Sequence, residues 1–296
     1  MSTKIHSKAI IDRSAQLGEG VIVGAYAIVE GGVTLGAGVS VNPLAHIKGN
    51  TTIGENTFIG TGAIIGERPQ MLGLHEDTGK LFIGKENVIR EYVTIHTSTD
   101  PEKETVLGNN NYLMGFVHIA HDCIIKNNVV MCNGTLVAGH AHLDDYAFLS
   151  GNVVVHQFVR IGKSAMVGGL SRINQDVPPF MMVIGDSRVW GLNLVGLKRR
   201  GYRKEEIANI RKAFNILYRK QLTLKSALAE LEQIPSESVK ELIVFILASK
   251  RGICPAKRGG LGEKLFLDYP YSLRTKIPAY FALMSSHRRM HKLAHR

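Results

Sequence analysis

The sequence predicts a mainly β protein: a solenoid of short strands in residues 1–190, followed by a C-terminal α-helical domain in residues 191–260. Three observations support this prediction. They are a six-residue repeat, the glycines within that repeat, and a change of period after it.

The repeat occupies most of the first 172 residues. Twenty-four hexads between Ile5 and Arg172, interrupted by two insertions, begin with Ile, Leu, Val or, once, Met131. A period of six fits neither the 3.6-residue period of a helix nor strands joined by long loops, but short extended segments with tight corners explain it. The first aliphatic residue of each hexad is expected to point inward, which gives a β-helix.

Glycine often occupies the second position of a hexad. We expect it to tolerate a strained backbone near each corner. The examples are Gly18, Gly24, Gly54, Gly60, Gly108 and Gly162.

Beyond the DVPPF segment at 176–180, the apolar residues take on helical spacing. One helix is expected within residues 203–220, a second follows it, and a third begins near Ser236 and stops near Gly252. Residues 261–296 form a basic tail of unknown order. The expected apolar faces are Ile207, Ile210, Phe214 and Leu217; Leu224, Leu228 and Leu231; and Val239, Leu242, Ile243 and Ile246.

The net charge of +11 belongs to the C-terminal third of the chain. Residues 1–196 carry 14 Lys and Arg against 17 Asp and Glu, and residues 197–296 carry 22 against 8. Such a basic surface favours an acidic partner, whether nucleic acid, anionic lipid or an acidic protein.

Composition also limits location and cysteine chemistry. The N-terminus lacks an apolar signal region, and the aliphatic run at 242–248 is far shorter than the roughly 20 residues of a membrane span. We therefore expect a cytoplasmic protein with no integral membrane segment. The three cysteines have no C-x-x-C spacing, which indicates neither a disulfide framework nor a thiolate zinc site.

The hexads resemble the left-handed parallel β-helix of the hexapeptide-repeat acyltransferases, in which three hexads make one triangular coil. That resemblance implies that residues 18 apart stack on one another. Gly139 then lies above His121 and His140 above Asp122, in the segment VHIAHDC at 117–123. Two coils up, His156 lies above Ala120 and Gln157 above His121.

Two kinds of chemistry fit this histidine column. In the first, His121 is a general base oriented by Asp122. In the second, several of the histidines bind zinc, as in the carbonic anhydrases built on the same type of helix.

Wider motifs resemble the UDP-N-acetylglucosamine O-acyltransferases that begin lipid A biosynthesis. The resemblance runs from about residue 5 to residue 255. It favours general-base chemistry by His121 over zinc binding. Its motifs are IREYVTIHT (89–97), HIAHDC (118–123), TLVAGH (135–140), VHQF (155–158), MVGG (166–169), QDVPPF (175–180) and GLNLVGLKRRGY (191–202).

This resemblance implies transfer of a 3-hydroxyacyl chain from acyl carrier protein to the sugar 3-hydroxyl, with no metal, cofactor or nucleic acid. It implies that His121 is the base, that Asp122 orients it, and that the Gly139 N–H stabilises the oxyanion. It also implies a homotrimer with sites between neighbouring solenoids, and a carrier protein bound to the basic domain. The further implied roles are sugar and phosphopantetheine contacts for His118, His140, His156 and Gln157, nucleotide contact for Asn193, anion contacts for Arg199 and Arg200, and acyl-length selection for Met166 and Gly169.

The chain departs from the family pattern where sugar contacts are expected. Met71 and Gly73 replace the usual Asp and Lys, and Val195 replaces a Glu found in some members. An altered sugar nucleotide, such as a 3-amino analogue, or a paralogue of low activity would fit these changes. A non-catalytic or nucleic-acid-binding scaffold is the alternative of a different class.

Overall fold

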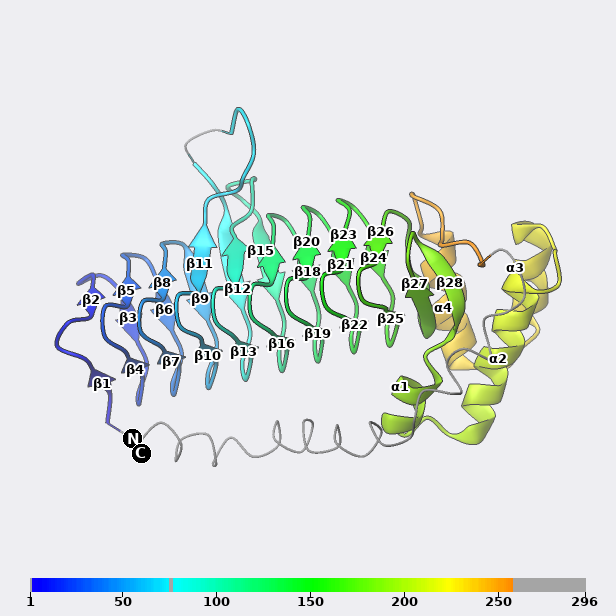
Figure 1. The fold of residues 1–296 in the computed structure, drawn as a ribbon, viewed down its shortest axis with the longest axis horizontal. Helices are drawn as coiled ribbons and strands as arrows, with labels where there is room; N and C mark the ends of the chain where they lie inside the picture. Colours follow the sequence, from blue (N-terminus) through cyan, green and yellow to red (C-terminus); the bar gives the residue numbers. More distant parts are fainter. Residues whose placement is uncertain (1, 75–76, 258–296) are drawn as a thin grey trace. The chain divides into compact units, whose positions relative to one another are not determined.

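The computed structural model describes residues 2–74 and 77–257, and it confirms a left-handed parallel β-helix with a short C-terminal helical region (Figure 1). Each coil places one strand in each of three sheets, here named A, B and C, whose strands pair in parallel except for β27 with β28 in sheet A. Contacts group Met1–Ala256 into one compact unit, while the division into domains near residue 190 stays a prediction. The predicted basic tail, 261–296, lies outside the described residues.

The strands are short because each side of the triangle is short. Sheet A contains β1 (Lys4–Ile5), β4 (Ile22–Val23), β7 (Ser40–Val41), β10 (Phe58–Ile59), β13 (Val88–Ile89), β16 (Tyr112–Leu113), β19 (Val130–Met131), β22 (Phe148–Leu149), β25 (Met166–Val167), β27 (Met181–Ile184) and β28 (Arg188–Leu192). Sheet B contains β2 (Ile10–Ile11), β5 (Ile28–Val29), β8 (His46–Ile47), β11 (Ile64–Glu67), β14 (Thr94–His96), β17 (His118–Ile119), β20 (Leu136–Val137), β23 (Val154–Val155) and β26 (Arg172–Ile173). Sheet C contains β3 (Gln16–Leu17), β6 (Thr34–Leu35), β9 (Thr51–Ile53), β12 (Lys80–Ile83), β15 (Glu104–Leu107), β18 (Ile124–Ile125), β21 (His142–Leu143) and β24 (Arg160–Ile161).

The register between coils confirms the expected spacing of 18. His118 pairs with Leu136, and Leu136 pairs with Val154. The pairing of Phe58 with Val88 spans the first insertion, and that of Val88 with Tyr112 spans the second. Both insertions leave sheet B and return in sheet C, the first between β11 and β12 and the second between β14 and β15 (Figure 1).

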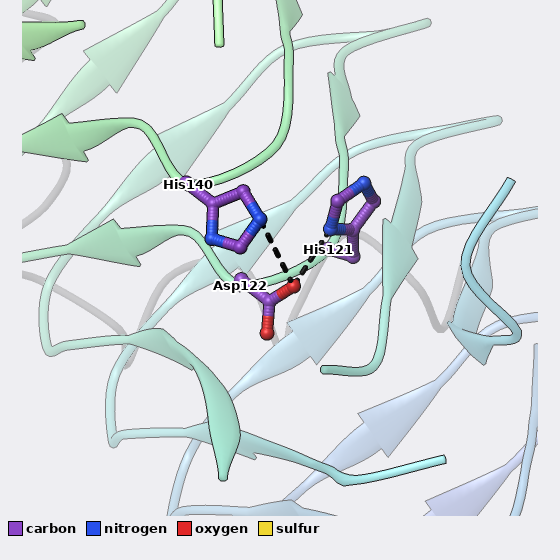
Figure 2. Close-up of side chains that lie close together, drawn as sticks. All are labelled: His121, Asp122 and His140. Carbon is purple, nitrogen blue, oxygen red and sulfur yellow. Dashed lines mark hydrogen bonds and ion pairs between the residues drawn. The ribbon is translucent and has the colours of Figure 1, made fainter. Parts of the chain in front are cut away.

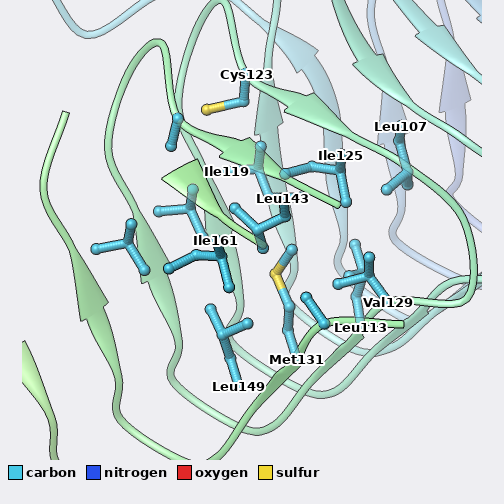
Figure 3. Close-up of a cluster of buried hydrophobic side chains, with 14 of the residues drawn as sticks. Leu107, Leu113, Ile119, Cys123, Ile125, Val129, Met131, Leu143, Leu149 and Ile161 are labelled. Carbon is cyan, nitrogen blue, oxygen red and sulfur yellow. The ribbon is translucent and has the colours of Figure 1, made fainter. Parts of the chain in front are cut away.

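The core is a column of stacked aliphatic side chains that fills the triangular coils (Figure 3). The first residue of the hexad points inward as predicted, and Leu113, Ile119 and Ile125 are at most 1% exposed. The fifth residue also points inward, as at Cys123 and Val129. Burying one such aliphatic side chain contributes about 1.5–3 kcal/mol, so every coil stabilises its neighbours.

The expected role of the second-position glycines was wrong. These residues do not have positive φ; they lie where the next coil passes too closely for a Cβ. A Cβ on Gly60 would lie 2.6 Å from the Glu91 nitrogen. The left-handed backbone falls two positions later, often on residues with side chains, such as Tyr92 (φ +56°) and Asp122 (φ +60°).

Within residues 2–257 as described, four helices follow the coils: α1 (Leu194–Arg199), α2 (Lys204–Tyr218), α3 (Leu224–Glu232) and α4 (Glu237–Leu247). The apolar faces of α2 and α4 agree with the prediction. Leu224 was wrongly predicted to be buried; it is 51% exposed in the first turn of α3, where Ala227 faces the core instead. α4 ends at Leu247, before Gly252.

Helix α4 and the residues that follow it attach to the last coils. The Ser249 hydroxyl donates to the Asp176 carboxylate (2.7 Å), and the Arg160 guanidinium lies 4.2 Å from the Phe245 ring centroid. Lys163 also forms an ion pair with Glu241 (3.1 Å). Within the described ranges, no helix has the length and apolar character needed to cross a membrane.

Close approach at Gly60 gives a stability prediction. Gly60→Ala should destabilise the protein by about 2–3 kcal/mol, because the methyl group meets backbone that cannot move without shifting a coil. Gly191→Ala is the matched control, since a Cβ there would meet nothing within 4 Å. Thermal denaturation of both variants checks this, and equal melting temperatures would refute the close-approach explanation.

Candidate active site

The corner between sheets B and C, named here the BC corner, assembles the predicted histidine column. His121 and Asp122 follow β17, and Gly139 and His140 follow β20. The His140 N–H donates to the His121 carbonyl (3.0 Å), and the Phe158 N–H donates to the Gly139 carbonyl (3.0 Å). Stacking of adjacent coils therefore brings together residues that are 18 apart in sequence.

His121 and Asp122 form a hydrogen-bonded dyad (Figure 2). The two atoms, His121 Nδ1 and Asp122 Oδ2, are 2.7 Å apart, and both side chains are mostly buried. A carboxylate accepts from Nδ1–H, so the neutral ring keeps a free lone pair on Nε2. This arrangement suits general-base chemistry.

Asp122 is held by several donors and is poised to remain ionised. Burial raises the pKa of its carboxyl, but hydrogen bonds from Ser98, His121 and Thr99 outweigh burial and hold that pKa below its ordinary value. The His140 Nε2 lies further from the same carboxylate oxygen, at 3.6 Å. Asp122 is therefore an anionic partner for His121 at neutral pH.

Gly139 lies directly against the His121 ring. A Cβ at Gly139 would be 2.5 Å from His121 Cε1 and 2.7 Å from Nε2, so only glycine leaves this ring position open. Among the described residues, the Gly139 N–H has no hydrogen-bond acceptor. The N–H of Gly139 is the kind of backbone donor that an oxyanion site requires.

His118 lies on the outer face of sheet B and differs from His121. Its Nδ1 is 2.8 Å from the Thr94 hydroxyl, and its ring meets His96 edge to face at 5.0 Å. Burial, with smaller contributions from His96 and His121, lowers the pKa of His118 to about 4. His118 is therefore neutral at pH 7, when it can contact a substrate without carrying charge.

Three neighbours of the dyad were not singled out by the sequence analysis. Ser98 and Thr99 contact Asp122, and His96 contacts both His118 and the first insertion, since its Nδ1 lies 2.6 Å from the Arg68 carbonyl. His96 lies within the motif IREYVTIHT, so that motif contained a signal for it. Ser98 and Thr99 lie at the start of the second insertion, where the hexad period gives no register.

The remaining predicted residues fall into three locations. His156 and Gln157 are exposed near the top of the BC corner. Met166 lies on the outer face of sheet A, between Phe148 and Met182, and Gly169 lies at the corner between sheets A and B, the AB corner. One chain therefore does not bring the predicted acyl-length residues next to His121.

Asn193 and Arg200 lie near the corner between sheets C and A. Asn193 is buried, and its side chain caps α1 and donates to the Ser164 carbonyl (2.9 Å). Arg200 donates through Nη2 to the Tyr146 carbonyl (2.8 Å). Its Nη1 is buried without a hydrogen-bond partner in the described ranges, whereas Arg199 is exposed.

The BC corner also contains a set of atoms with metal-binding chemistry. One donor atom from each of His121, Asp122 and His140 lies within 4.8 Å of the others. Three such ligands suit a divalent cation such as zinc. Both Asp122 oxygens already accept hydrogen bonds, from Ser98, Thr99 and His121, so a metal on Asp122 would compete with these donors.

Comparison with known proteins finds relatives that are acyltransferases. Residues 176–254 match the second domain of the family described as UDP-N-acetylglucosamine O-acyltransferase, and residues 32–67 and 104–139 match the bacterial transferase hexapeptide repeat. A curated relative from Paraburkholderia phymatum, named acyl-[acyl-carrier-protein]--UDP-N-acetylglucosamine O-acyltransferase, is 43% identical over 259 residues, 85% of this chain and 99% of the relative. One of the same name from Gloeothece citriformis is 44% identical over 203 residues, 66% of this chain and 74% of that one.

Solved structures agree with these sequence relatives. The UDP-N-acetylglucosamine acyltransferase of Francisella novicida superposes with a TM-score of 0.84 at 36% identity, covering 90% of this chain and 99% of that chain. The enzyme of the same name from Campylobacter jejuni gives a TM-score of 0.81 at 38% identity, covering 86% and 100%. The sequence match covers 99% of the Paraburkholderia relative, and the fold match covers 99% and 100% of the two solved chains. The chain belongs to the UDP-N-acetylglucosamine O-acyltransferase family.

Proposed function

We propose that this protein moves a 3-hydroxyacyl chain from acyl carrier protein to the 3-position of UDP-N-acetylglucosamine, the first step of lipid A biosynthesis. The names of the relatives give both the carrier and the sugar nucleotide. The observation that carries the proposal is the His121–Asp122 dyad, with Gly139 packed against the His121 ring. A cytoplasmic location belongs to the same proposal, and recovery of the chain with membranes after cell fractionation would contradict it.

Acyl transfer needs one group that accepts and returns a proton, and one hydrogen-bond donor that stabilises the oxyanion. His121 Nε2 takes the proton of the sugar hydroxyl while that oxygen attacks the thioester carbonyl carbon. The resulting oxyanion accepts a hydrogen bond from the Gly139 N–H. The C–S bond then breaks, and the imidazolium returns its proton to the departing thiolate.

This sequence of steps leaves His121 neutral and requires no covalent enzyme intermediate. The nearby Cys123 thiol agrees with that mechanism. Burial raises the pKa of Cys123 to about 12, so it remains a thiol rather than a nucleophilic thiolate at neutral pH. The dyad and the names of the relatives favour acyl transfer over the alternative of a zinc-dependent, carbonic anhydrase-like enzyme.

An exposed apolar face supports a homotrimer with sites between chains. On sheet B, Leu136 pairs with His118 and Val154 pairs with Leu136, and these two apolar side chains are 44% and 43% exposed. At the AB corner, the rings of Tyr92 and Phe116 stack at 5.3 Å, and both side chains are more than half exposed. Contiguous apolar surface of this kind is typical of an interface, and a second copy would cover it.

The basic surface of α2 supports docking of an acidic carrier protein. Arg211 and Lys212 are exposed and line a hollow along this helix with Lys220. Acidic side chains of the carrier would pair with these cations and guide its approach.

The identity of the acceptor sugar depends on the first insertion. Met71 is 54% exposed, and a Cβ at Gly73 would meet nothing within 4 Å, so neither position presents the carboxylate or ammonium group that the family pattern provides. An acceptor that carries its own amine at the 3-position is therefore included in the proposal as an alternative to the hydroxyl.

Acyl transfer is tested by pairing hydroxyacyl carrier proteins of several chain lengths with UDP-N-acetylglucosamine and with its 3-amino analogue. We expect a product from at least one pair, and His121→Ala should lower kcat at least about 1,000-fold because the base is lost. His142→Ala, which changes an exposed histidine of sheet C, is the control. No product from any pair would return the protein to the scaffold class.

The trimer is tested by light scattering, which should give three times the 32.5 kDa chain mass. Leu136→Glu should lower that mass, because it buries a charge in the proposed interface. Ile124→Glu, at a comparably exposed site on sheet C (37%), should leave it unchanged. A wild-type protein with the mass of one chain would contradict the proposal.

Carrier docking is tested by Arg211→Glu combined with Lys212→Glu. We expect KM for the acyl carrier protein to rise about ten-fold while KM for the sugar nucleotide is unchanged, since charge complementarity acts on the carrier alone. Lys4→Glu, on the exposed first strand, is the matched charge reversal. An unchanged carrier KM in the α2 variant would exclude this surface.

A further inference from the structure

The second insertion folds over the carboxylate of the dyad. The Ser98 hydroxyl donates to Asp122 Oδ1 (2.5 Å), and the Thr99 hydroxyl donates to Oδ2 (2.7 Å). The Thr99 N–H points to both oxygens, at 3.3 and 3.4 Å. Ser98 is fully buried, so solvent cannot replace its hydrogen bond.

The same insertion also fixes the backbone of Asp122. The Asp122 N–H donates to the Thr105 hydroxyl (2.7 Å), and Thr105 is buried at the far end of the insertion. Asp122 has φ +60°, a conformation that costs free energy for a residue with a side chain. The insertion therefore holds both the strained backbone and the carboxylate.

The insertion is itself anchored to the strand that returns from the first insertion. The Ser98 N–H donates to the Lys80 carbonyl (3.2 Å), and the Gly79 N–H donates to the Ser98 carbonyl (2.9 Å). A Cβ at Gly79 would overlap the carbonyl oxygens of Asp100 and Lys103, so glycine permits this close packing. The two insertions therefore pack against each other, and together they hold Asp122 at the BC corner.

This support of Asp122 matters because two histidines compete for one carboxylate oxygen. Asp122 Oδ2 lies 2.7 Å from His121 Nδ1 and 3.6 Å from His140 Nε2. A carboxylate free to rotate would divide its hydrogen bonds between the two rings. Donors on both of its oxygens fix it in the orientation that favours His121.

We infer that Ser98 and Thr99 are positioning residues for acyl transfer, which hold Asp122 so that His121 keeps its proton on Nδ1 and its lone pair on Nε2. This inference rests on the proposed function, because it assumes that His121 is the base. Neither residue touches the reacting atoms. Their loss should therefore lower kcat and leave substrate binding unchanged.

The test compares near-isosteric variants within one short segment. Thr99→Val and Ser98→Ala each remove a hydroxyl that contacts Asp122, and Thr99→Ser retains it. Thr97→Val is the matched control, because the Thr97 hydroxyl is buried without a hydrogen-bond partner in the described part of the chain. Melting temperatures establish that each variant is folded, and His121→Ala is assayed beside them.

We expect Thr99→Val and Ser98→Ala to lower kcat about ten-fold each with both KM values unchanged, since each removes a hydrogen bond to a charged group. Thr99→Ser should restore activity, and Thr97→Val should match the wild type. The inference is overturned if Thr99→Val and Ser98→Ala behave like Thr97→Val, or if their losses appear in KM. An active His121→Ala variant would instead overturn the proposed function.

Discussion

The stacking of one coil on the next is the constraint on which the rest of this structure depends. Backbone N–H groups of the strands find acceptors in the neighbouring coil, and inward aliphatic side chains pack on their counterparts there, 18 residues away except across the two insertions. A shift of one residue would turn that aliphatic side chain outward and disrupt the column. Both insertions leave the chain and rejoin it without changing which residues face inward, as the pairing of Ile65 with Ile95 and of Ile95 with Ile119 shows.

The same constraint builds the site. A corner must turn the chain sharply, and it does so with left-handed backbone at Asp122, His140 and Phe158. Repetition of that corner at every coil places functional side chains in a column with little additional structure. The close approach between coils then explains Gly139, since the His121 ring occupies the volume that a side chain there would need.

The two insertions make the BC corner chemically different from the other two corners. They occur in consecutive coils directly before the coil that carries His121, and both lie between sheet B and sheet C. Polar groups from the second insertion surround Asp122, while the first insertion reaches His96 through the Arg68 carbonyl. A repetitive scaffold thus acquires a specific site where its repeat is interrupted, because only the interruption can bring new donors to one corner.

The sequence by itself determined a β-helix in which the first residue of each hexad points inward, because a strict period converts position in the chain into position in space. The stacking of Gly139 over His121 followed from the family resemblance, which implies three hexads in each coil, and the register of the structure agrees with it. The sequence also located α2, α3 and α4 but not α1, and the exposure of Leu224 and the end of α4 at Leu247 were seen only in the structure. Only the tertiary structure showed why glycine occupies the second position. The next coil passes too close for a Cβ there, and the backbone itself is not strained. The tertiary structure alone revealed the contacts of Ser98, Thr99 and Thr105 with Asp122, since residues in an insertion have no period, and their partners are set by folding in three dimensions.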